Sequence, residues 1–262
     1  MLLSVLIPVY NERKTLATLL EIVCAALPGV DKELIVVDDC SSDGTRDWLR
    51  GNFPDGARSA TSIAVDPRGN LTLAQAQPGA TVTIRPLYHE HNKGKGGALQ
   101  TALAAATGDV LVVQDADLEY DPQDWTLMLD LIVARKVADV VYGSRFHGRP
   151  HRSLHFHHYL ANRLISTVFS LLYNQTLSDV EVCYKMFTRQ VRDTLRITYN
   201  DFGFELQLGA QIARARRWRI YEVGIQYYGR TYDEGKKINW KDGVKALWYL
   251  VKFRFGREGA PP

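Results

Sequence analysis

Cysteines, long apolar runs and excess charge are all scarce in this sequence, and each absence excludes a class of protein. The three cysteines, Cys24, Cys40 and Cys183, form no CxxC pair and no spacing typical of metal ligands. Their odd number and wide separation argue against a disulfide framework and favour a reducing compartment. No stretch approaches the roughly 18 apolar residues that a membrane-spanning helix requires. The apolar N-terminal stretch is too short for a signal peptide and lacks a basic leader, so we expect a cytoplasmic protein.

The rest of the composition is that of an ordinary globular protein. Of the 262 residues, 46% are hydrophobic and 23% are charged, which provides enough apolar side chains for one large α/β domain, with or without a small appendage. The formal net charge of +3 says little about partners, and we expect no nucleic acid among them. The positions of the basic residues matter more than their small excess.

Apolar runs that alternate with helical patterns indicate the fold. Short apolar runs predict buried strands at 2–9, 33–37, 81–87, 109–113 and 137–142. Apolar spacing, capping residues and alanine content predict helices at 11–26, from residue 42 and at 94–107. Residues 54–79, rich in Pro, Gly, Ser and Ala, predict an extended loop or small hairpin. Further helices are predicted at 151–174, 204–214 and 240–255, and a strand at 218–225. This order is typical of a parallel sheet covered on both faces by helices.

Polar side chains directly follow three of the predicted strands. They are Tyr10-Asn11-Glu12, Asp38-Asp39 and Asp115-Ala116-Asp117. In sheets of this kind, ligands bind beyond the carboxyl ends of the strands. Because buried strands do not otherwise end in carboxylates so regularly, the pattern favours a catalytic cleft at this edge.

The acidic triplet Asp115, Asp117 and Glu119 indicates a metal site. Alternate residues of an extended chain point the same way, so these carboxylates can line one side of a turn. Close, uncompensated carboxylates repel, and at least one would take up a proton. A hard cation such as Mg²⁺ or Mn²⁺ removes that repulsion, and is commonly held by one or two carboxylates together with substrate phosphates. The alternative is a solvated acidic turn.

A glycine-rich segment at 92–97 opens the predicted helix at 94–107. Its glycines allow a ligand to approach the backbone, and a helix N-terminus beside Lys95 favours anions. The spacing does not match a Walker A sequence. A purely structural helix start explains the segment equally well.

Several segments together resemble one known family. They are residues 4–12, 35–45, 91–99, 109–122, 142–146, 178–187 and 222–243 (SVLIPVYNE, IVVDDCSSDGT, HNKGKGGAL, DVLVVQDADLEYDP, YGSRF, SDVEVCYKMF and EVGIQYYGRTYDEGKKINWKDG). In this order they resemble the family 2 glycosyltransferases with a GT-A fold, and within them the dolichol-phosphate mannose synthase-like (polyprenyl-phosphate hexose synthase) group. The resemblance implies an α/β, Rossmann-like, mostly parallel sheet with helices on both faces and additional C-terminal helices on the acceptor side. It also implies a catalytic domain at 1–228, containing an insertion at 54–80 and an acceptor-side loop and helix at 145–175, then a mobile loop and amphipathic helix at 229–262.

The resemblance implies a binding site for a nucleotide diphosphate sugar, of the GDP-mannose or UDP-glucose type, and an Mg²⁺ or Mn²⁺ ion. Asp39 is favoured over Asp38 for accepting hydrogen bonds from the base, while Asp38 alternatively caps the following loop. Arg145, Arg230 and Lys236 are expected near the diphosphate, where preorganised cations stabilise the departing charge. The full set of expected donor-binding residues is Pro8, Tyr10, Glu12, Val37, Asp38, Asp39, Lys95, Asp115, Ala116, Asp117, Arg230 and Lys236, with Asp117 and Arg145 as the catalytic residues.

The predicted acceptor is a polyprenyl phosphate, because a sugar hydroxyl needs a general base and a phosphate monoester does not. The segment 145–163 is rich in arginine and histidine, and Arg145, His147 and Arg163 are expected to hold the acceptor phosphate. We therefore predict direct displacement at the anomeric carbon with inversion of configuration. The terminal helix mixes aromatic and basic residues, which is typical of an interfacial helix, although packing against the domain explains it equally well. A peripheral location on the cytoplasmic face of a membrane, directly or through a membrane partner protein, follows as an expectation.

Three alternatives remain at this stage. A family 2 enzyme with a hydroxyl acceptor would need a base, for which Glu181 or Asp179 is the candidate. A nucleotide-sugar-binding protein without catalysis is the second alternative, and a nucleotidyltransferase of similar sheet topology is the third.

Overall fold

The computed structural model describes residues 1–67, 69–74, 80–148, 150, 152, 156–230 and 240–256, apart from the side chains of 240–242. Its strands are β1 (Leu2–Val9), β2 (Asp31–Asp38), β3 (Arg58–Ala60), β4 (Ser62–Val65), β5 (Leu71–Ala74), β6 (Val82–Tyr88), β7 (Val110–Val113), β8 (Val140–Ser144), β9 (Lys185–Thr188) and β10 (Ile220–Gly224). Its helices are α1 (Leu16–Ala25), α2 (Thr45–Asn52), α3 (Gly94–Ala105), α4 (Trp125–Leu129), α5 (Phe156–Tyr173), α6 (Arg189–Arg192), α7 (Gly203–Ala215) and α8 (Trp240–Phe255), with short helical turns η1 (Pro122–Asp124) and η2 (Asp130–Ala134).

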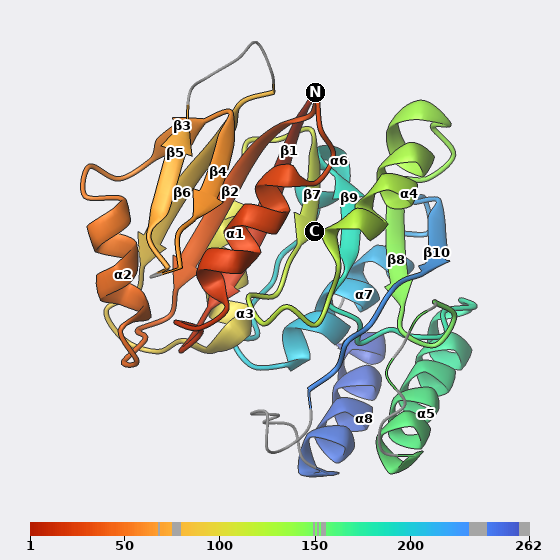
Figure 1. The fold of residues 1–262 in the computed structure, drawn as a ribbon. Coiled ribbons are helices and arrows are strands. Elements are labelled where there is room, and N and C mark those ends of the chain that lie inside the picture. The colour runs from red at the N-terminus through yellow and green to blue at the C-terminus, as the bar shows by residue number, and fades with distance from the viewer. Residues whose placement is uncertain are drawn as a thin grey trace.

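In the described part of the chain, eight strands form one sheet in the order β10-β8-β9-β7-β1-β2-β6-β3. The neighbouring pairs β7–β1, β1–β2, β2–β6 and β8–β10 are parallel. β9 runs antiparallel between β7 and β8, and β3 is antiparallel at the edge. The predicted mostly parallel α/β sheet is therefore confirmed (Figure 1).

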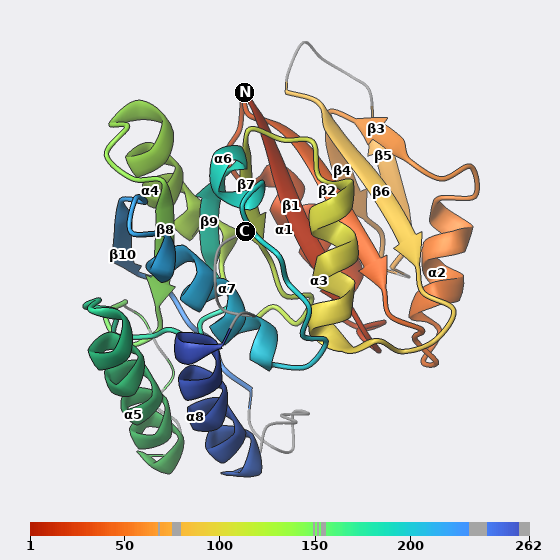
Figure 2. The same ribbon diagram turned by 180° about the vertical axis from the view of Figure 1, so that it is seen from behind.

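The helices cover both faces of this sheet, as predicted. α1 lies in front of β1 and β2 in Figure 1, whereas α3 and α7 lie on the opposite face in Figure 2. One side of α1 is fully buried through Leu16, Leu19, Leu20 and Val23. α3 packs against β1 and β2 through a buried side that includes Ala98, Leu99 and Ala102.

Several element boundaries differ from the sequence prediction, and local hydrogen bonds explain them. The predicted helix from residue 42 begins at Thr45, because Gly44 is left-handed and the Asp43 carboxylate accepts a hydrogen bond from the Thr45 amide at 3.0 Å. The strand predicted from residue 137 begins at Val140, because the amides of Val137 and Ala138 bond back to the Leu131 carbonyl.

The antiparallel strand β9 was not predicted. Its first residue, Lys185, is fully buried in the sheet and forms an ion pair with Glu205 of α7. The sequence pattern did not predict a buried strand here because the segment begins with a lysine, and a charged side chain is rarely buried without a partner.

Residues 54–74 contain three strands. β3 adds to the edge of the main sheet, while β4 and β5 form a separate antiparallel pair. This hairpin packs against α1, and the Trp48 indole of α2 donates a hydrogen bond to the Gly69 carbonyl at 2.7 Å. The segment lies at the side of the sheet (Figure 1), and its turn at Gly69 comes close to the Arg13 guanidinium in the loop after β1.

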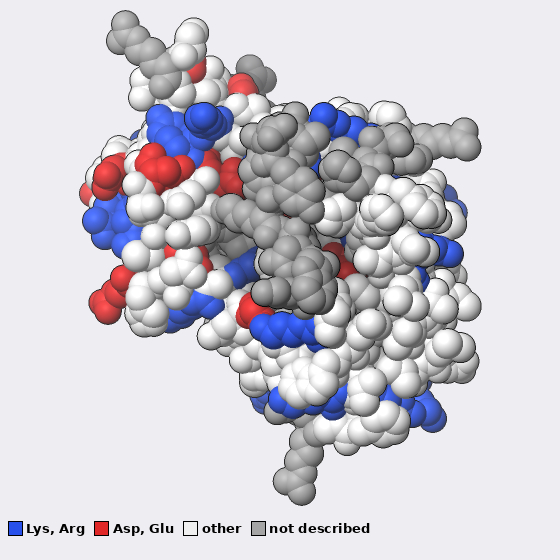
Figure 3. All heavy atoms as spheres, turned by 90° about the horizontal axis from the view of Figure 1, so that it is seen from below, with Lys and Arg blue, Asp and Glu red and all other residues white. Residues whose placement is uncertain are grey.

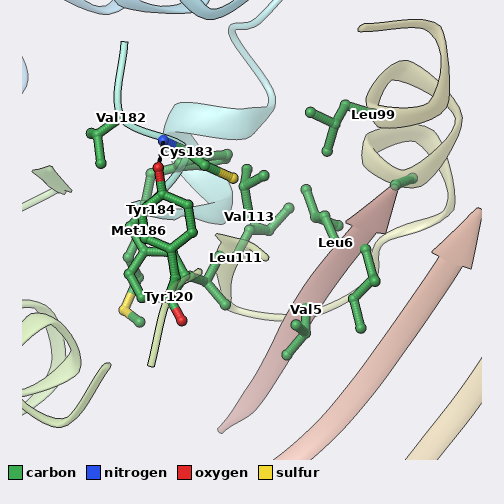
Figure 4. Close-up of a cluster of buried hydrophobic side chains, with 14 of the residues drawn as sticks. Val5, Leu6, Leu99, Leu111, Val113, Tyr120, Val182, Cys183, Tyr184 and Met186 are labelled. Atoms are coloured by element: carbon green, nitrogen blue, oxygen red, sulfur yellow. Dashed lines mark hydrogen bonds between the residues drawn. The ribbon is translucent and has the colours of Figure 1, made fainter. Parts of the chain in front are cut away.

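α5 and α8 lie side by side beyond the carboxyl ends of the parallel strands, as both ribbon views show (Figures 1 and 2). α8 also packs against α7, and Leu250 and Phe253 are fully buried in this contact region. Another part of the same core joins β1, β7 and α3 to residues 182–186 (Figure 4). There, Tyr120 stacks on Tyr184 with ring centroids 4.8 Å apart, and its hydroxyl accepts a hydrogen bond from the Cys183 amide.

Candidate active site

The loops that follow β1, β2 and β7 meet at one edge of the sheet, as the sequence predicted. The three strands are adjacent and parallel, so their carboxyl ends lie together. Side-chain hydrogen bonds join the loops: the Thr15 hydroxyl donates to the Ala116 carbonyl at 2.7 Å, and the Asn11 amide donates to the Ser41 hydroxyl at 3.0 Å. The polar residues after the strands therefore form one cluster.

Asp115 is held by a half-buried lysine. Both of its carboxylate oxygens contact the Lys95 ammonium, at 2.7 and 2.9 Å, and Lys95 lies 3.9 Å from Glu205. Burial opposes the charge of Lys95, but Asp115 and Glu205 outweigh it and raise the pKa of the lysine well above its ordinary value. Glu205 in turn pairs with Lys185. Asp115, Lys95, Glu205 and Lys185 thus form a row of alternating charges that leads from the site into the protein interior.

Asp117, Glu119 and Glu12 surround the guanidinium of Arg230. The Arg230 side chain contacts Glu12 at 3.1 Å, Asp117 at 3.0 Å and Glu119 at 3.5 Å. Burial, together with the charges of Asp115 and Glu119, raises the pKa of Asp117 to about 7 even with Arg230 beside it. The acids thus remain incompletely neutralised by the protein's own cations.

The donor set at Asp115 and Asp117 fits a hard divalent cation, because it offers carboxylate oxygens in a place with excess negative charge. Within the described residues, no group of three or more His, Cys, Asp or Glu side chains is arranged to hold a metal ion. Glu119, the third expected ligand, accepts hydrogen bonds from the Arg230 amide at 2.8 Å and the Tyr227 hydroxyl at 3.0 Å. Asp115 and Asp117 would therefore be the ligands that the chain itself supplies.

The carboxylates expected at the nucleoside are both buried and both hydrogen-bonded within the protein. Asp38 pairs with Arg46 at 2.6 Å, while Asp39 accepts from the amides of Lys93 and Gly94 at 2.8 Å and contacts His89 at 2.7 Å. Asp39 thereby fixes the start of α3 next to β2. Pro8 and Val37 are paired across β1 and β2, and Tyr10 is 40% exposed at the end of β1.

Arg145, at the end of β8, is held in a fixed orientation by Asp179. Two of its nitrogens contact the two Asp179 oxygens at 2.7 Å each, and a third contact of 3.4 Å reaches Asn162 on α5. Its guanidinium lies 5.6 Å from the centre of the Tyr227 ring, and the Tyr227 hydroxyl bonds Glu119. The Tyr227 ring therefore lies between Arg145 and Glu119 of the acid cluster.

The other expected acceptor residues lie near Arg145 but are less constrained. Arg163 on α5 reaches the Ser178 carbonyl at 3.5 Å, and His147 is exposed in the loop after β8. Lys236 lies outside the described residues, as do Arg149, His151 and His155 of the basic segment.

Glu181 differs from its acidic neighbours because it has no hydrogen-bond or ion-pair partner within the described part of the chain. Burial raises the pKa of its carboxyl to about 7, against the opposing charge of Arg145. Asp179, by contrast, is fully buried and committed to Arg145.

Sequence reasoning missed Lys185, Glu205, Asn162 and Tyr227 as parts of the site. They come from β9, α7, α5 and the loop after β10, and only the folded chain brings them beside Asp115 and Arg145. The available signal was the pair of charged residues, Lys185 and Glu205, inside otherwise apolar segments.

A mostly parallel sheet, with acids and cations gathered at its carboxyl edge, defines the class of α/β proteins that bind ligands beyond the strand ends. The Glycosyl transferase family 2 profile matches residues 4–59 and 71–196, more than half of the chain, so the chain belongs to this family. The internal gap of this match, residues 60–70, lies within the β3–β5 segment.

Relatives within the family act on polyprenyl phosphates, by their names. An undecaprenyl-phosphate mannosyltransferase of Micrococcus luteus is 28% identical over 276 residues, covering 96% of this chain and 98% of that protein. An undecaprenyl-phosphate 4-deoxy-4-formamido-L-arabinose transferase of Serratia proteamaculans is 26% identical over 235 residues, and the match covers 89% of this chain and 62% of that protein. This chain thus matches about three fifths of the length of the second relative. The resemblance to the polyprenyl-phosphate group is confirmed.

Solved structures confirm the GT-A fold. A glucosyl-3-phosphoglycerate synthase from Mycobacterium tuberculosis, in complex with Mn²⁺, UDP and glucosyl-3-phosphoglycerate, matches with a TM-score of 0.64 and 19% identity, covering 99% of this chain and 81% of that one. At this identity the likeness concerns the fold.

Proposed function

We propose that this protein transfers a hexose from a nucleotide diphosphate sugar to a polyprenyl phosphate, with inversion at the anomeric carbon. The observation that carries the proposal is the arrangement of Asp115, Asp117 and Arg230 at the strand ends, one ring away from Arg145. In this proposal the Arg145 guanidinium binds the acceptor phosphate, and the carboxylates of Asp115 and Asp117 hold the metal-bound diphosphate on the other side of the Tyr227 ring. The names of the relatives support a polyprenyl phosphate as the acceptor, and one of them supports a hexose as the transferred sugar.

On the donor side, Asp115 and Asp117 would hold Mg²⁺ or Mn²⁺, which would neutralise the diphosphate as it leaves. Lys95 keeps the Asp115 carboxylate in place, because its ammonium contacts both carboxylate oxygens and is supported by Glu205. Pro8, Tyr10, Glu12, Val37, Asp38, Asp39 and Ala116 line the ends of β1, β2 and β7, where the nucleoside is proposed to bind. Arg230 would contact the diphosphate, and Lys236 is proposed for the same task.

On the acceptor side, Arg145 is preorganised to bind a phosphate. Its Nε and Nη2 are taken up by Asp179 and Asn162, while its Nη1 has no hydrogen-bond partner among the described residues. A phosphate monoester carries about −1.5 to −2 charge at pH 7 and is itself the nucleophile, so it needs cations to offset repulsion by the donor. His147 and Arg163 are proposed to add to this site.

The lipid part of the acceptor is proposed to reach the site from a membrane surface touched by α5 and α8. None of the described helices combines the length and apolar character that crossing a bilayer demands. These two helices nevertheless expose large apolar side chains to an unusual degree: Phe156 67%, Leu160 54%, Leu164 52% and Leu171 79% on α5, and Val244 59%, Trp248 56%, Val251 50% and Phe255 75% on α8. We call this set the α5–α8 apolar face.

The charges around the α5–α8 apolar face favour an anionic lipid surface. α5 carries no Asp or Glu, and α8 carries one acid, Asp242, in its first turn, whereas the two helices carry five basic residues, Arg163, Lys241, Lys245, Lys252 and Arg254. Figure 3 views the molecule from this side, and shows a broad uncharged area with Lys and Arg side chains along its border. Apolar side chains bordered by cations are typical of proteins that lie on anionic membranes.

The test is a screen of sugar nucleotides with Mg²⁺ or Mn²⁺ against a short polyprenyl phosphate, with product mass as the readout. We expect a hexosyl phosphate lipid from at least one GDP- or UDP-sugar, and none when the metal is chelated. Transfer only to hydroxyl acceptors, or full activity in the chelator, contradicts the proposal.

Arg145→Ala should reduce kcat/KM for the lipid phosphate by about a hundredfold, because the lost charge-assisted hydrogen bonds act on the acceptor. Donor binding, measured by calorimetry, should stay within about twofold. Because Arg145→Ala leaves Asp179 buried and unpaired, the double variant Arg145→Ala/Asp179→Asn is the folding control. Unchanged acceptor use in both variants excludes Arg145 from the phosphate site.

A second candidate is transfer to a hydroxyl group, with Glu181 as the base. The observation in its favour is the unpartnered Glu181 carboxyl, whose pKa burial raises to about 7, close to what general-base catalysis needs. Glu181→Gln distinguishes the two reactions. It should abolish transfer to a hydroxyl, but leave transfer to a phosphate intact, since the phosphate brings no proton that must be removed.

A further inference from the structure

Arg230 occupies the same acid cluster that the proposed metal needs. Its Nη2 lies 3.0 Å from an Asp117 oxygen and 3.1 Å from a Glu12 oxygen, and its Nε lies 3.5 Å from Glu119. Those contacts raise the pKa of Arg230 above its ordinary value despite the opposing effect of burial. One guanidinium thus offsets charge on three carboxylates at once.

Backbone contacts hold Arg230 at this place. The Arg230 amide donates to Glu119 at 2.8 Å, and the Tyr228 amide donates to the Glu119 carbonyl at 2.9 Å. The Tyr227 hydroxyl bonds the Glu119 carboxylate, and Tyr120 and Tyr227 form an isolated bridge. The loop that carries Arg230 is therefore tied to the acidic turn itself, so the guanidinium and the turn are positioned together.

Lys95, the other cation of the site, is held in a different way. It pairs with both oxygens of Asp115, stands on a helix and lies between Asp115 and the buried Glu205. Displacing it would leave Glu205 with less compensation in the protein interior, which is costly. The Arg230 side chain is about as exposed as that of Lys95, at 27% against 23%, but it reaches its partners from a loop, and those carboxylates are 16–17% exposed, compared with 7% for Glu205. Of the two cations, Arg230 is the one that can leave.

We infer that Arg230 acts as a resident counter-ion, which fills the cation position at Asp117 when no donor is bound and is displaced from it by the metal. The inference rests on the metal site of the proposed function. Once displaced, the guanidinium is free to pair with the diphosphate that accompanies the metal. Without nucleotide, the metal and Arg230 therefore compete for Asp117, so the metal binds weakly. Once the nucleotide diphosphate is bound, the metal and Arg230 both contact it, and each favours the binding of the other.

The experiment measures Mn²⁺ binding without any nucleotide or acceptor, by the electron paramagnetic resonance signal of free Mn²⁺. The variants are Arg230→Ala and Arg230→Gln. The matched control is Arg135→Ala, which removes an arginine that pairs with Asp130 on the surface. We expect both Arg230 variants to bind Mn²⁺ about tenfold more tightly than the wild type, and the control to bind as the wild type does.

A second arm adds UDP or GDP, chosen by which of them binds the wild type. The advantage of the Arg230 variants should then disappear or reverse, since they lack the guanidinium that would meet the diphosphate. Thermal melting without metal checks that the variants are folded. Adding Asp117→Asn to Arg230→Ala should remove the gain in Mn²⁺ affinity.

Unchanged or weaker Mn²⁺ binding by folded Arg230 variants overturns the inference, as does an advantage that persists with nucleotide, or the absence of Mn²⁺ binding by every protein. A failure of the proposed sugar transfer is a separate result, because neither arm involves a sugar or an acceptor. Tighter Mn²⁺ binding in the variants supports the counter-ion role even if the acceptor is not a polyprenyl phosphate.

Discussion

At the scale of single residues, the site is organised by charges that are only partly compensated. Asp115 has a dedicated lysine, Asp179 has a dedicated arginine, and Asp117 shares Arg230 with two other acids. Glu181 has no partner among the described residues. Burial is the main reason why the pKa values of Asp117 and Glu181 are raised to about 7. Buried acids with raised pKa values are candidates for the chemistry of the site, whereas Asp115 and Asp179 are each committed to one cation.

Asp117→Asn should lower turnover by at least about a hundredfold, because the amide removes the charge that would bind the metal. The melting temperature should stay the same or rise, since the carboxylate is held at a raised pKa in the folded protein. Initial rates and circular dichroism measure the two effects. Asp130→Asn, at a surface ion pair, is the control for loss of a carboxylate. Wild-type turnover in Asp117→Asn would remove this residue from the metal site.

Glu181 should make the stability of the protein depend on pH. Burial raises the pKa of this carboxyl from 4.5 to about 7, so the folded state favours the protonated form. The stability that the protonated Glu181 carboxyl contributes to the folded state is fully present below the unfolded pKa near 4.5, and is lost as the pH rises through 7. The unfolding free energy of Glu181→Gln relative to the wild type should therefore increase by about 1–3 kcal/mol as the pH rises from 5 to 8. A difference that is constant over this range contradicts the assignment.

At the scale of elements, each charged group depends on where a strand or helix ends. Asp38 ends β2, and Glu12, Asp39, Asp115 and Asp117 follow β1, β2 and β7. These strands are neighbours in the sheet, so the sequence predicted that the acids meet. Arg145 follows β8, which β9 separates from β7. Because β9 was not predicted, the distance between Arg145 and the acids could not be derived from the sequence. The buried Lys185 hid this strand, since its partner Glu205 lies on another element.

Helix α8 contains two phenylalanines, one buried and one exposed, whose substitution tests how the helix packs. Phe253 is fully buried against Tyr199 and Tyr249, whereas Phe255 is 75% exposed. Phe253→Ala should reduce the unfolding free energy by about 3 kcal/mol, and Phe255→Ala by less than about 0.5 kcal/mol. Urea titrations measure both. Equal losses would show that α8 is not packed as described.

At the scale of the whole molecule, the site and the α5–α8 apolar face lie at the same end. The parallel strands end above these two helices, and the same end carries Arg145 and Arg163 (Figure 1). A lipid phosphate at a membrane surface would therefore meet the arginines without crossing the domain. Residues 54–74 lie at the edge of the sheet, and no role in the reaction is proposed for them.

The double variant Leu171→Ser/Trp248→Ser should weaken membrane binding. Both side chains are more than half exposed on the α5–α8 apolar face, so their loss costs lipid contact rather than packing. In vesicle sedimentation with anionic lipid, we expect at least about a fivefold loss of the bound fraction, and binding of the wild type that weakens with salt. The control is Leu127→Ser/Tyr221→Ser, at side chains that are 46% and 43% exposed on α4 and β10. Equal binding by all three proteins would exclude this face as the contact.

The sequence by itself determined the α/β sheet, the family, and the acids that follow β1, β2 and β7, because periodicity and strand ends are local properties. The tertiary structure decided which cation each acid receives. Lys95 pairs with Asp115, Arg230 with Asp117 and Arg145 with Asp179, across separations from 20 to 113 positions. Such pairings depend on which elements become neighbours and on how much water burial removes. A local sequence pattern shows neither which elements become neighbours nor how far a side chain is buried.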